Sequence, residues 1–172
     1  MALIKSCRGK LPKISKSSWI AENATLVGDL KMGENCSIWF NAVVRADVNS
    51  IEFGNNVNIQ DGAIIHCTYE KTKTVLGDNV SVGHNALVHG CKVGNNVLIG
   101  MGAIVMDNCV IEDNCIIAAG AVLLEKTIVK SGSVYAGVPA KKIKDLSPEL
   151  FEGEVKRIAK NYRMYASWME DQ

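Results

Sequence analysis

Aliphatic residues recur at every sixth position along most of the chain. In the second half of the sequence, the leading residues of these hexads are Val93, Ile99, Val105, Ile111, Ile117, Leu123, Val129 and Tyr135. The same register occurs earlier at Ile20, Leu26, Met32, Ile38 and Val44, and then at Phe53, Ile59, Ile65, Leu76, Val82 and Val88. An amphipathic helix repeats every 3.6 residues and a half-buried strand every two, so neither element explains this period.

A period of six is typical of a short strand followed by a corner, with the leading residue pointing inward. Three hexads close one triangular coil, and successive coils stack as parallel strands. About nineteen hexads therefore predict an all-β solenoid, a parallel β-helix of about six triangular coils. The register breaks at three places: insertions fall within residues 47–51 and 69–74, and one residue is missing between Val88 and Val93. These breaks predict loops or tight corners.

A helical pattern replaces the hexads near the C-terminus. Ser147 and Pro148 are suited to the N-cap and the first position of a helix. The apolar residues that follow are spaced by four and three positions, at Phe151, Val155, Ile158, Tyr162, Tyr165 and Met169. The sequence therefore predicts a β-helix domain over residues 1–146, with repeats from about 18 to 140, and a C-terminal helix within residues 147–172 that packs on the solenoid.

Composition and charge narrow the range of partners. Lys and Arg total 19 and Asp and Glu total 18, which predicts no nucleic-acid partner and no attraction to an anionic membrane. No apolar run is long enough to span a membrane, and the first residues do not resemble a secretory signal, so we expect a cytoplasmic protein. The six cysteines have no CxxC spacing, which favours reduced thiols that fill space in the core.

The hexad count brings the three histidines of the chain into relation. His66 follows the leading residue Ile65, and His89 follows Val88 three hexads later. The two histidines are therefore predicted to lie one coil apart on the same face, whereas His84 lies on a different face. Histidines that only pack or hydrogen-bond at a subunit contact are the alternative interpretation.

Charged and amide side chains extend these two faces. Arg45 is predicted one coil below His66, and Asp61, beside Gln60, one coil below His84. A three-fold rotation would press one face against the other and give three composite sites, each with two imidazoles from one subunit and one from the next. Three neutral imidazoles with an open fourth position suit catalytic zinc, with iron or cobalt as alternatives. Arg45 and Asp61 would then pair across the joint.

Five motifs occur within residues 18–144: RAD at 45–47, NIQDGAIIH at 58–66, SVGHNALVHG at 81–90, IGMGA at 99–103 and GVPAK at 137–141. In these motifs the sequence resembles the γ-class carbonic anhydrase-like family of the hexapeptide-repeat superfamily. The resemblance implies a left-handed coil and a homotrimer whose metal is held by His66 and His89 of one chain and His84 of its neighbour. The implied activity is that of a lyase, the reversible hydration of carbon dioxide to bicarbonate.

The same resemblance implies roles for further side chains. Gln60 would hydrogen-bond to bicarbonate or to activated water, and Asp47 would orient Arg45 for its pairing with Asp61.

Active members of the family have glutamate at two positions where this sequence does not. This sequence has Val48 and Tyr69 at these positions, and Glu70 follows one place after Tyr69. Tyr69 and Glu70, together with Gln60, are the catalytic candidates. The missing carboxylates are expected to affect proton export more than metal binding.

Two other classes of function stay open. A hexapeptide-repeat acyltransferase would use one histidine as a general base toward an acceptor and would need no metal. Its acyl-coenzyme A would meet lysines near the C-terminal end, at Lys126, Lys130, Lys141, Lys142 and Lys144. A non-catalytic trimeric scaffold or metal store is the third class.

Overall fold

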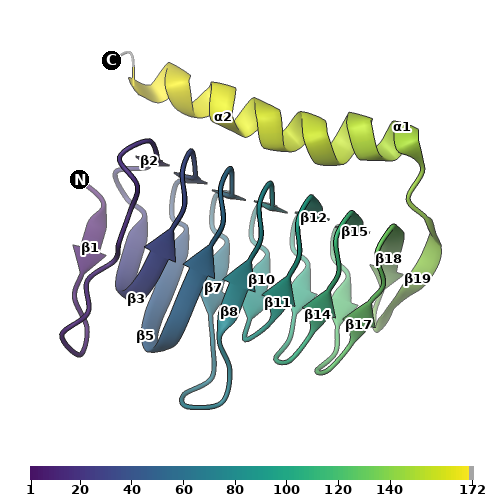
Figure 1. Cartoon of the computed structure of the whole chain (residues 1–172), viewed down its shortest axis with the longest axis horizontal. Coiled ribbons are helices and arrows are strands. Elements are labelled where there is room, and N and C mark those ends of the chain that lie inside the picture. The colour runs from purple at the N-terminus through teal and green to yellow at the C-terminus, as the bar shows by residue number, and fades with distance from the viewer. Residues whose placement is uncertain (171–172) are drawn as a thin grey trace.

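The chain folds into a left-handed parallel β-helix of about seven turns with one helical segment at the C-terminus. The computed structural model describes residues 1–170, and Figure 1 shows the C-terminal helix lying along the length of the solenoid. The predicted architecture is confirmed, but the prediction of about six coils is too low. The hexads between Ile20 and Tyr135 span six complete turns and begin a seventh, which adds one more strand to the stack.

One face of the prism is an eight-stranded sheet, and the other two faces share an eleven-stranded sheet. The first sheet comprises β2 (Trp19–Ile20), β4 (Ser37–Ile38), β6 (Asn58–Ile59), β9 (Ser81–Val82), β12 (Val97–Ile99), β15 (Cys115–Ile117), β18 (Ser133–Gly137) and β19 (Ala140–Asp145). All of its pairings are parallel except the final pairing of β18 with β19.

The larger sheet bends around a corner at its long strands. Its long strands are β3 (Thr25–Met32) and β5 (Val43–Phe53), and β1 (Leu3–Lys5) pairs with β3. On one side of the corner lie β7 (Ile64–His66), β10 (Leu87–His89), β13 (Ile104–Val105) and β16 (Val122–Leu123). On the other side lie β8 (Thr74–Leu76), β11 (Lys92–Val93), β14 (Val110–Ile111) and β17 (Ile128–Val129).

The leading residues of the hexads form the core. Ile38, Ile59, Val82, Ile99 and Ile117 stack directly upon one another in register, and all five are fully buried. Side chains of one type above one another leave few voids, so the aliphatic ladder stabilises each coil through the next.

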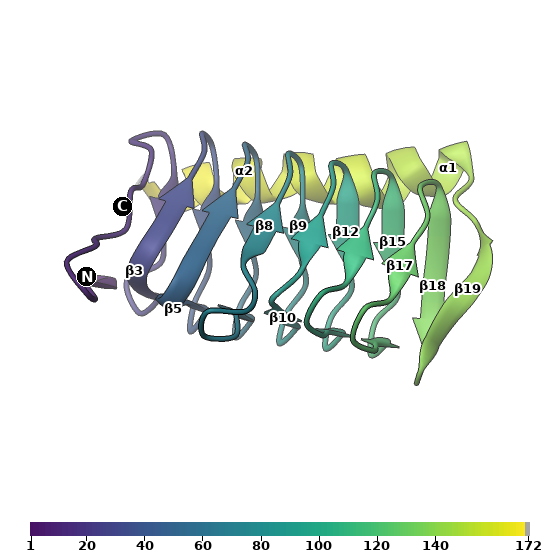
Figure 2. The same ribbon diagram turned by 60° about the horizontal axis from the view of Figure 1, so that its bottom comes forward.

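The three breaks in register become three local features. The insertion at 47–51 is absorbed within β5, opposite a register shift between Gly28 and Leu30. The insertion at 69–74 lies in the loop between β7 and β8, which hangs below the prism in Figure 1 and comes forward at its lower edge in Figure 2. The missing residue before Val93 leaves a tight corner at Gly90, whose φ is +54°. Two of these features adjoin the histidines.

The C-terminal helical segment begins where the sequence predicts. The Ser147 side chain accepts a hydrogen bond from the Leu150 amide at 3.3 Å. The segment comprises α1 (Pro148–Leu150), a π-helical stretch η1 (Phe151–Lys156) and α2 (Arg157–Glu170). Val155 is buried against Ile116 and Val134. Residues 171–172 of the predicted segment lie outside the described residues, and no helix within 1–170 is long and apolar enough to cross a membrane.

Candidate metal centre

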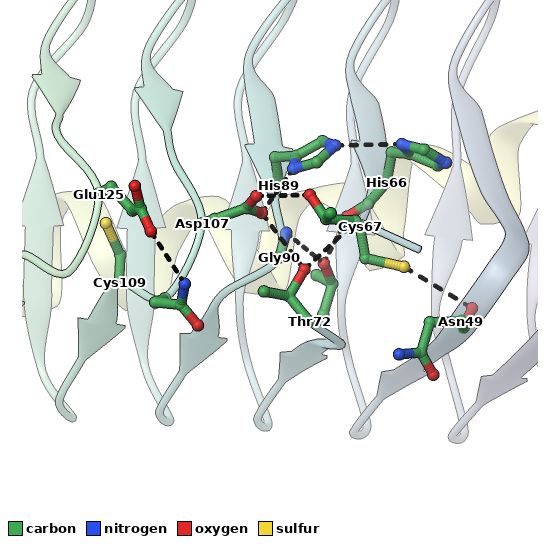
Figure 3. Close-up of polar contacts among 12 residues, drawn as sticks. Asn49, His66, Cys67, Thr72, His89, Gly90, Asp107, Cys109 and Glu125 are labelled. Carbon is green, nitrogen blue, oxygen red and sulfur yellow. Dashed lines mark hydrogen bonds and ion pairs between the residues drawn. The ribbon is translucent and has the colours of Figure 1, made fainter. Parts of the chain in front are cut away.

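Two of the three histidines lie side by side on one face of the prism. β7 and β10 pair in register, with His66 opposite His89. The Nδ1 atom of His66 is 3.1 Å from the Nε2 atom of His89, and Figure 3 shows the two rings with these atoms facing each other. The predicted stacking of these two histidines is therefore confirmed despite the insertion between them.

A carboxylate holds the other nitrogen of each ring. His66 Nε2 is 3.0 Å from Asp47 Oδ1, and His89 Nδ1 is 2.7 Å from Asp107 Oδ1. Burial opposes ionisation of both aspartates, but hydrogen bonds from Arg45 and His66 lower the pKa of Asp47, and those from Thr68 and His89 lower the pKa of Asp107. Both side chains are therefore carboxylates at neutral pH.

An ionised carboxylate accepts hydrogen bonds and cannot donate them. The ring nitrogens that face Asp47 and Asp107 therefore carry hydrogens, and in the neutral form of each ring the nitrogen that faces the other ring has a lone pair. Burial, together with the charge of Arg45, lowers the pKa of His66 and favours its neutral form. Two lone pairs that face each other at 3.1 Å repel unless a cation lies against both.

The donor pair fits a tetrahedral transition metal. Bonds of 2.0–2.1 Å to zinc at a tetrahedral angle place two nitrogens about 3.4 Å apart. The observed separation of 3.1 Å is close to this value, and the carboxylates behind the rings match the partners that metal-binding histidines usually have.

The third histidine lies on another face, at the corner after β9. His84 Nδ1 is 2.9 Å from Asp61 Oδ2, and His84 Nε2 is 3.1 Å from the Tyr162 hydroxyl on α2. Burial raises the pKa of Tyr162 to about 12, so its hydroxyl donates to Nε2 while Asp61 accepts from Nδ1. His84 therefore has the same tautomer as His89, with its hydrogen on Nδ1, and the lone pair on its Nε2 accepts from Tyr162.

A single chain brings together only part of the predicted ligand set. Within residues 1–170, no three His, Cys, Asp or Glu side chains converge on one ion-sized point. One face carries the His66–His89 pair and another carries His84, as the hexad count predicts. A complete set of three imidazoles requires a second copy of the chain.

The other predicted site residues are placed as follows. Arg45 forms an ion pair with Asp47 on its own strand, while Asp61 contacts His84, so the Arg45–Asp61 pair between subunits stays a prediction. Gln60 is buried, and its amide donates to Asn58 at 3.0 Å. Gln60 also lines a groove of about 420 Å³ that runs from His84 beneath the C-terminal helix.

The candidates in the inserted loop lie apart from the histidines. The ring of Tyr69 is half exposed. The guanidinium carbon of Arg8 lies over this ring, 5.6 Å from the ring centroid. Glu70 is exposed, with a φ of +54°. Within the described part of the chain, neither residue forms a hydrogen bond or ion pair with a histidine.

Two functional candidates, Asp107 and Tyr162, are not predicted from the sequence. Asp107 lies two positions after the leading residue Val105, one coil beyond His89 but one position outside its column, so the hexad count does not predict their contact. Tyr162 belongs to the apolar stripe that the sequence predicts for the helix. No signal in the sequence shows that its hydroxyl reaches His84, because that contact depends on how the helix crosses the sheet.

Comparison with known proteins points to one family. A family model described as bacterial transferase hexapeptide (six repeats) matches residues 73–105 and 90–125. The chain is 45% identical to a probable carbonic anhydrase of Methanocaldococcus jannaschii, over 91% of this chain and 96% of that protein. It is 40% identical to a carbonic anhydrase of Geobacillus kaustophilus, over 93% of this chain and 87% of that protein.

Other relatives are longer or carry other names. The mitochondrial gamma carbonic anhydrase 2 of Arabidopsis thaliana is 38% identical over 89% of this chain, but the match spans only 56% of that protein. A crystal structure of a hexapeptide transferase family protein from Anaplasma phagocytophilum has a TM-score of 0.91 and 38% identity over 96% of both chains. A galactoside acetyltransferase in complex with coenzyme A, at 23% identity over 69% of this chain and 66% of that chain and a TM-score of 0.55, shares the fold alone.

Proposed function

The chain belongs to the γ-class carbonic anhydrase-like family of hexapeptide-repeat proteins, and on this basis we propose that it hydrates carbon dioxide reversibly at metal centres between the subunits of a homotrimer. The observation that carries the proposal is the facing pair of nitrogens on His66 and His89, each made a lone-pair donor by a carboxylate. His84 of a neighbouring chain is the third ligand. Zinc, iron and cobalt all accept three imidazoles.

The residues of the chain divide the work of the site. A metal bound there supplies Lewis-acid activation of water at neutral pH. Asp47 and Asp107 hold the two imidazoles in the orientation that such an ion needs. Gln60 donates its amide hydrogen to Asn58, which leaves its carbonyl oxygen available to accept a hydrogen bond from the hydroxyl of bicarbonate. Because positions 48 and 69 carry valine and tyrosine and not glutamate, other groups must take up the proton that leaves the site.

An aliphatic stripe supports association on the face that bears the histidine pair. Outward positions on five neighbouring strands carry Val43, Ile64, Leu87, Ile104 and Val122, which lie in register. None of the five is buried in the single chain. A continuous apolar stripe without charge is typical of a surface that a partner covers. In the proposed trimer, the face of the next subunit that carries His84 covers it.

Subunit complementation tests the split ligand set. Neither a His84→Ala chain nor a chain with both His66→Ala and His89→Ala should retain zinc, although both should remain trimeric. Mixed trimers made by refolding the two variants together should regain zinc, because the His84 of one variant then meets the intact pair of the other. Carbon dioxide hydration, followed by stopped-flow with a pH indicator, should return with the metal. Mixed trimers that bind no zinc would contradict the proposal.

Acyl transfer from coenzyme A is the second candidate, since the similar structure from Anaplasma phagocytophilum is described as a hexapeptide transferase family protein. That reaction needs one histidine as general base and no metal. Binding of coenzyme A by a protein that holds no metal favours the transferase. A trimer that binds zinc but hydrates no carbon dioxide favours a non-catalytic scaffold.

A further inference from the structure

We propose that Asp107, fixed by the hydroxyls of Thr68 and Thr72, is a positioning residue that sets the ring of His89 so that Nε2 faces the metal. This inference rests on the proposed metal centre and assigns a role to a residue on the coil that follows His89.

The carboxylate of Asp107 is engaged at both oxygens. Oδ1 lies 2.7 Å from Nδ1 of His89 and 3.3 Å from the hydroxyl of Thr72. Oδ2 accepts a hydrogen bond from the hydroxyl of Thr68 at 2.6 Å. Figure 3 shows the carboxylate between the histidine ring and Thr72. With three donors from two directions, the carboxylate has one orientation, and it is the orientation that reaches His89.

The inserted loop supplies both hydroxyls. The Thr68 amide donates to the Thr72 hydroxyl oxygen at 2.9 Å, and the Thr72 amide donates to the Thr68 carbonyl at 3.2 Å. The loop therefore closes on itself between these two residues. Thr72 is buried although it belongs to a surface insertion. The insertion that interrupts the hexads thus ends in a rigid turn directed at Asp107.

The contacts favour positioning over proton transfer. The carboxylate of Asp107 contacts Nδ1 of His89, whereas the nitrogen that faces the proposed ion is Nε2, so Asp107 acts on the ring and not on the open side of the centre. The hydrogen on Nδ1 of His89 is instead kept in place, which keeps the lone pair on Nε2. Carboxylate partners of this kind alter metal affinity by about 10- to 100-fold when they are removed.

The direct test compares Asp107→Asn with Asp113→Asn. Asp113 also holds a corner, by accepting a hydrogen bond from the Asn95 amide at 2.7 Å, so its variant loses the same charge away from the histidines. Two measurements apply: the tautomer of each histidine in the metal-free trimer, from long-range ¹⁵N–¹H correlation spectra, and the Kd for zinc, from competition with a chelator.

We expect Asp107→Asn to lower the population of His89 that is protonated at Nδ1 and to raise the zinc Kd by about 10- to 100-fold. Asp113→Asn should leave both quantities at the wild-type values. Thr68→Val keeps the carboxylate and its charge but frees one oxygen, so its effect on the zinc Kd should be smaller and in the same direction. This variant also tests the inference if Asp107→Asn does not form a trimer.

Wild-type tautomer and zinc affinity in folded Asp107→Asn, or an equal loss in Asp113→Asn, would overturn the inference. If Asp107→Asn forms no trimer, a wild-type zinc Kd in Thr68→Val would do the same. Failure of the proposed function has a different signature. In that case the wild-type trimer binds no zinc, while the tautomer of His89 in the metal-free protein still reports whether Asp107 sets it.

Discussion

Replacement of Gly90 by alanine perturbs the support of the metal centre without touching a ligand. Gly90 directly follows His89 and has a φ of +54°. A Cβ atom placed there would lie 1.8 Å from Oδ1 of Asp107 and 2.3 Å from the hydroxyl of Thr72. Because both separations are far below van der Waals contact, the carboxylate and the loop must move away.

The cost has two parts that a control separates. A non-glycine residue in the left-handed region costs about 1–2 kcal/mol. Displacement of Asp107 weakens hydrogen bonds to a charged group, each of which contributes about 1.5–3 kcal/mol. We therefore expect Gly90→Ala to lower the free energy of unfolding by about 3–5 kcal/mol. Gly120 has a φ of +68° with no atom within 4 Å of its Cβ position, so Gly120→Ala should show only the first part.

Urea unfolding of both variants measures the difference, and the zinc Kd shows whether it reaches the site. Gly90→Ala should weaken zinc binding by about 10-fold or more, as loss of the carboxylate partner does, whereas Gly120→Ala should bind zinc like the wild type. Equal unfolding free energies for the two alanine variants would refute the reasoning. So would a destabilised Gly90→Ala protein that keeps wild-type affinity for zinc.

Three further predictions concern other parts of the molecule. Ile104→Asp places a charge on the aliphatic stripe and should convert trimer to monomer in light scattering, with loss of zinc; a trimer that persists contradicts the proposed interface. Tyr162→Phe removes the hydroxyl that occupies Nε2 of His84, so zinc affinity should stay equal or increase, and a tenfold decrease would contradict this. Burial raises the pKa of the Cys36, Cys67, Cys91, Cys109 and Cys115 thiols, so at pH 8 a disulfide reagent should modify only Cys7 rapidly, and all six cysteines once the chain is unfolded.

The fold could be predicted from the sequence because every coil repeats the same environment. Nearly all leading residues occupy inward positions that water does not reach, as the complete burial of Ile38, Ile65 and Leu123 shows. A periodic pattern of this kind averages out local exceptions such as Phe53 or Tyr135. The number of turns was less accurate, since the hexads do not show whether a partial coil at the end adds a strand.

The column of His66 and His89 could also be predicted, because the insertion between them follows the strand and does not shift it. β7 and β10 keep their pairing, and residues 69–73 leave the prism as a loop. The side-chain orientations could not be predicted. That Asp107 turns back toward His89 depends on hydrogen bonds from the loop, and that Tyr162 meets His84 depends on the crossing of the helix, neither of which follows from the hexad count.

In this fold the inward residues form the core, whereas the outward residues form the functional sites. Proteins that share the fold can therefore differ in their chemistry. The inward ladder determines the likeness to transferase structures, since a hexapeptide protein needs it whatever it does. The functional side chains lie at outward positions, and in this chain these positions have different roles. Val48 packs partly buried against the core and Tyr69 lies against Arg8, so the two positions at which the family resemblance implies glutamate make other contacts in this chain. The donor set of His66 and His89 depends on neither residue, because Asp47 and Asp107 orient it. The loss of those glutamates is therefore compatible with an intact metal centre, and it confines the question of turnover to how protons leave the site.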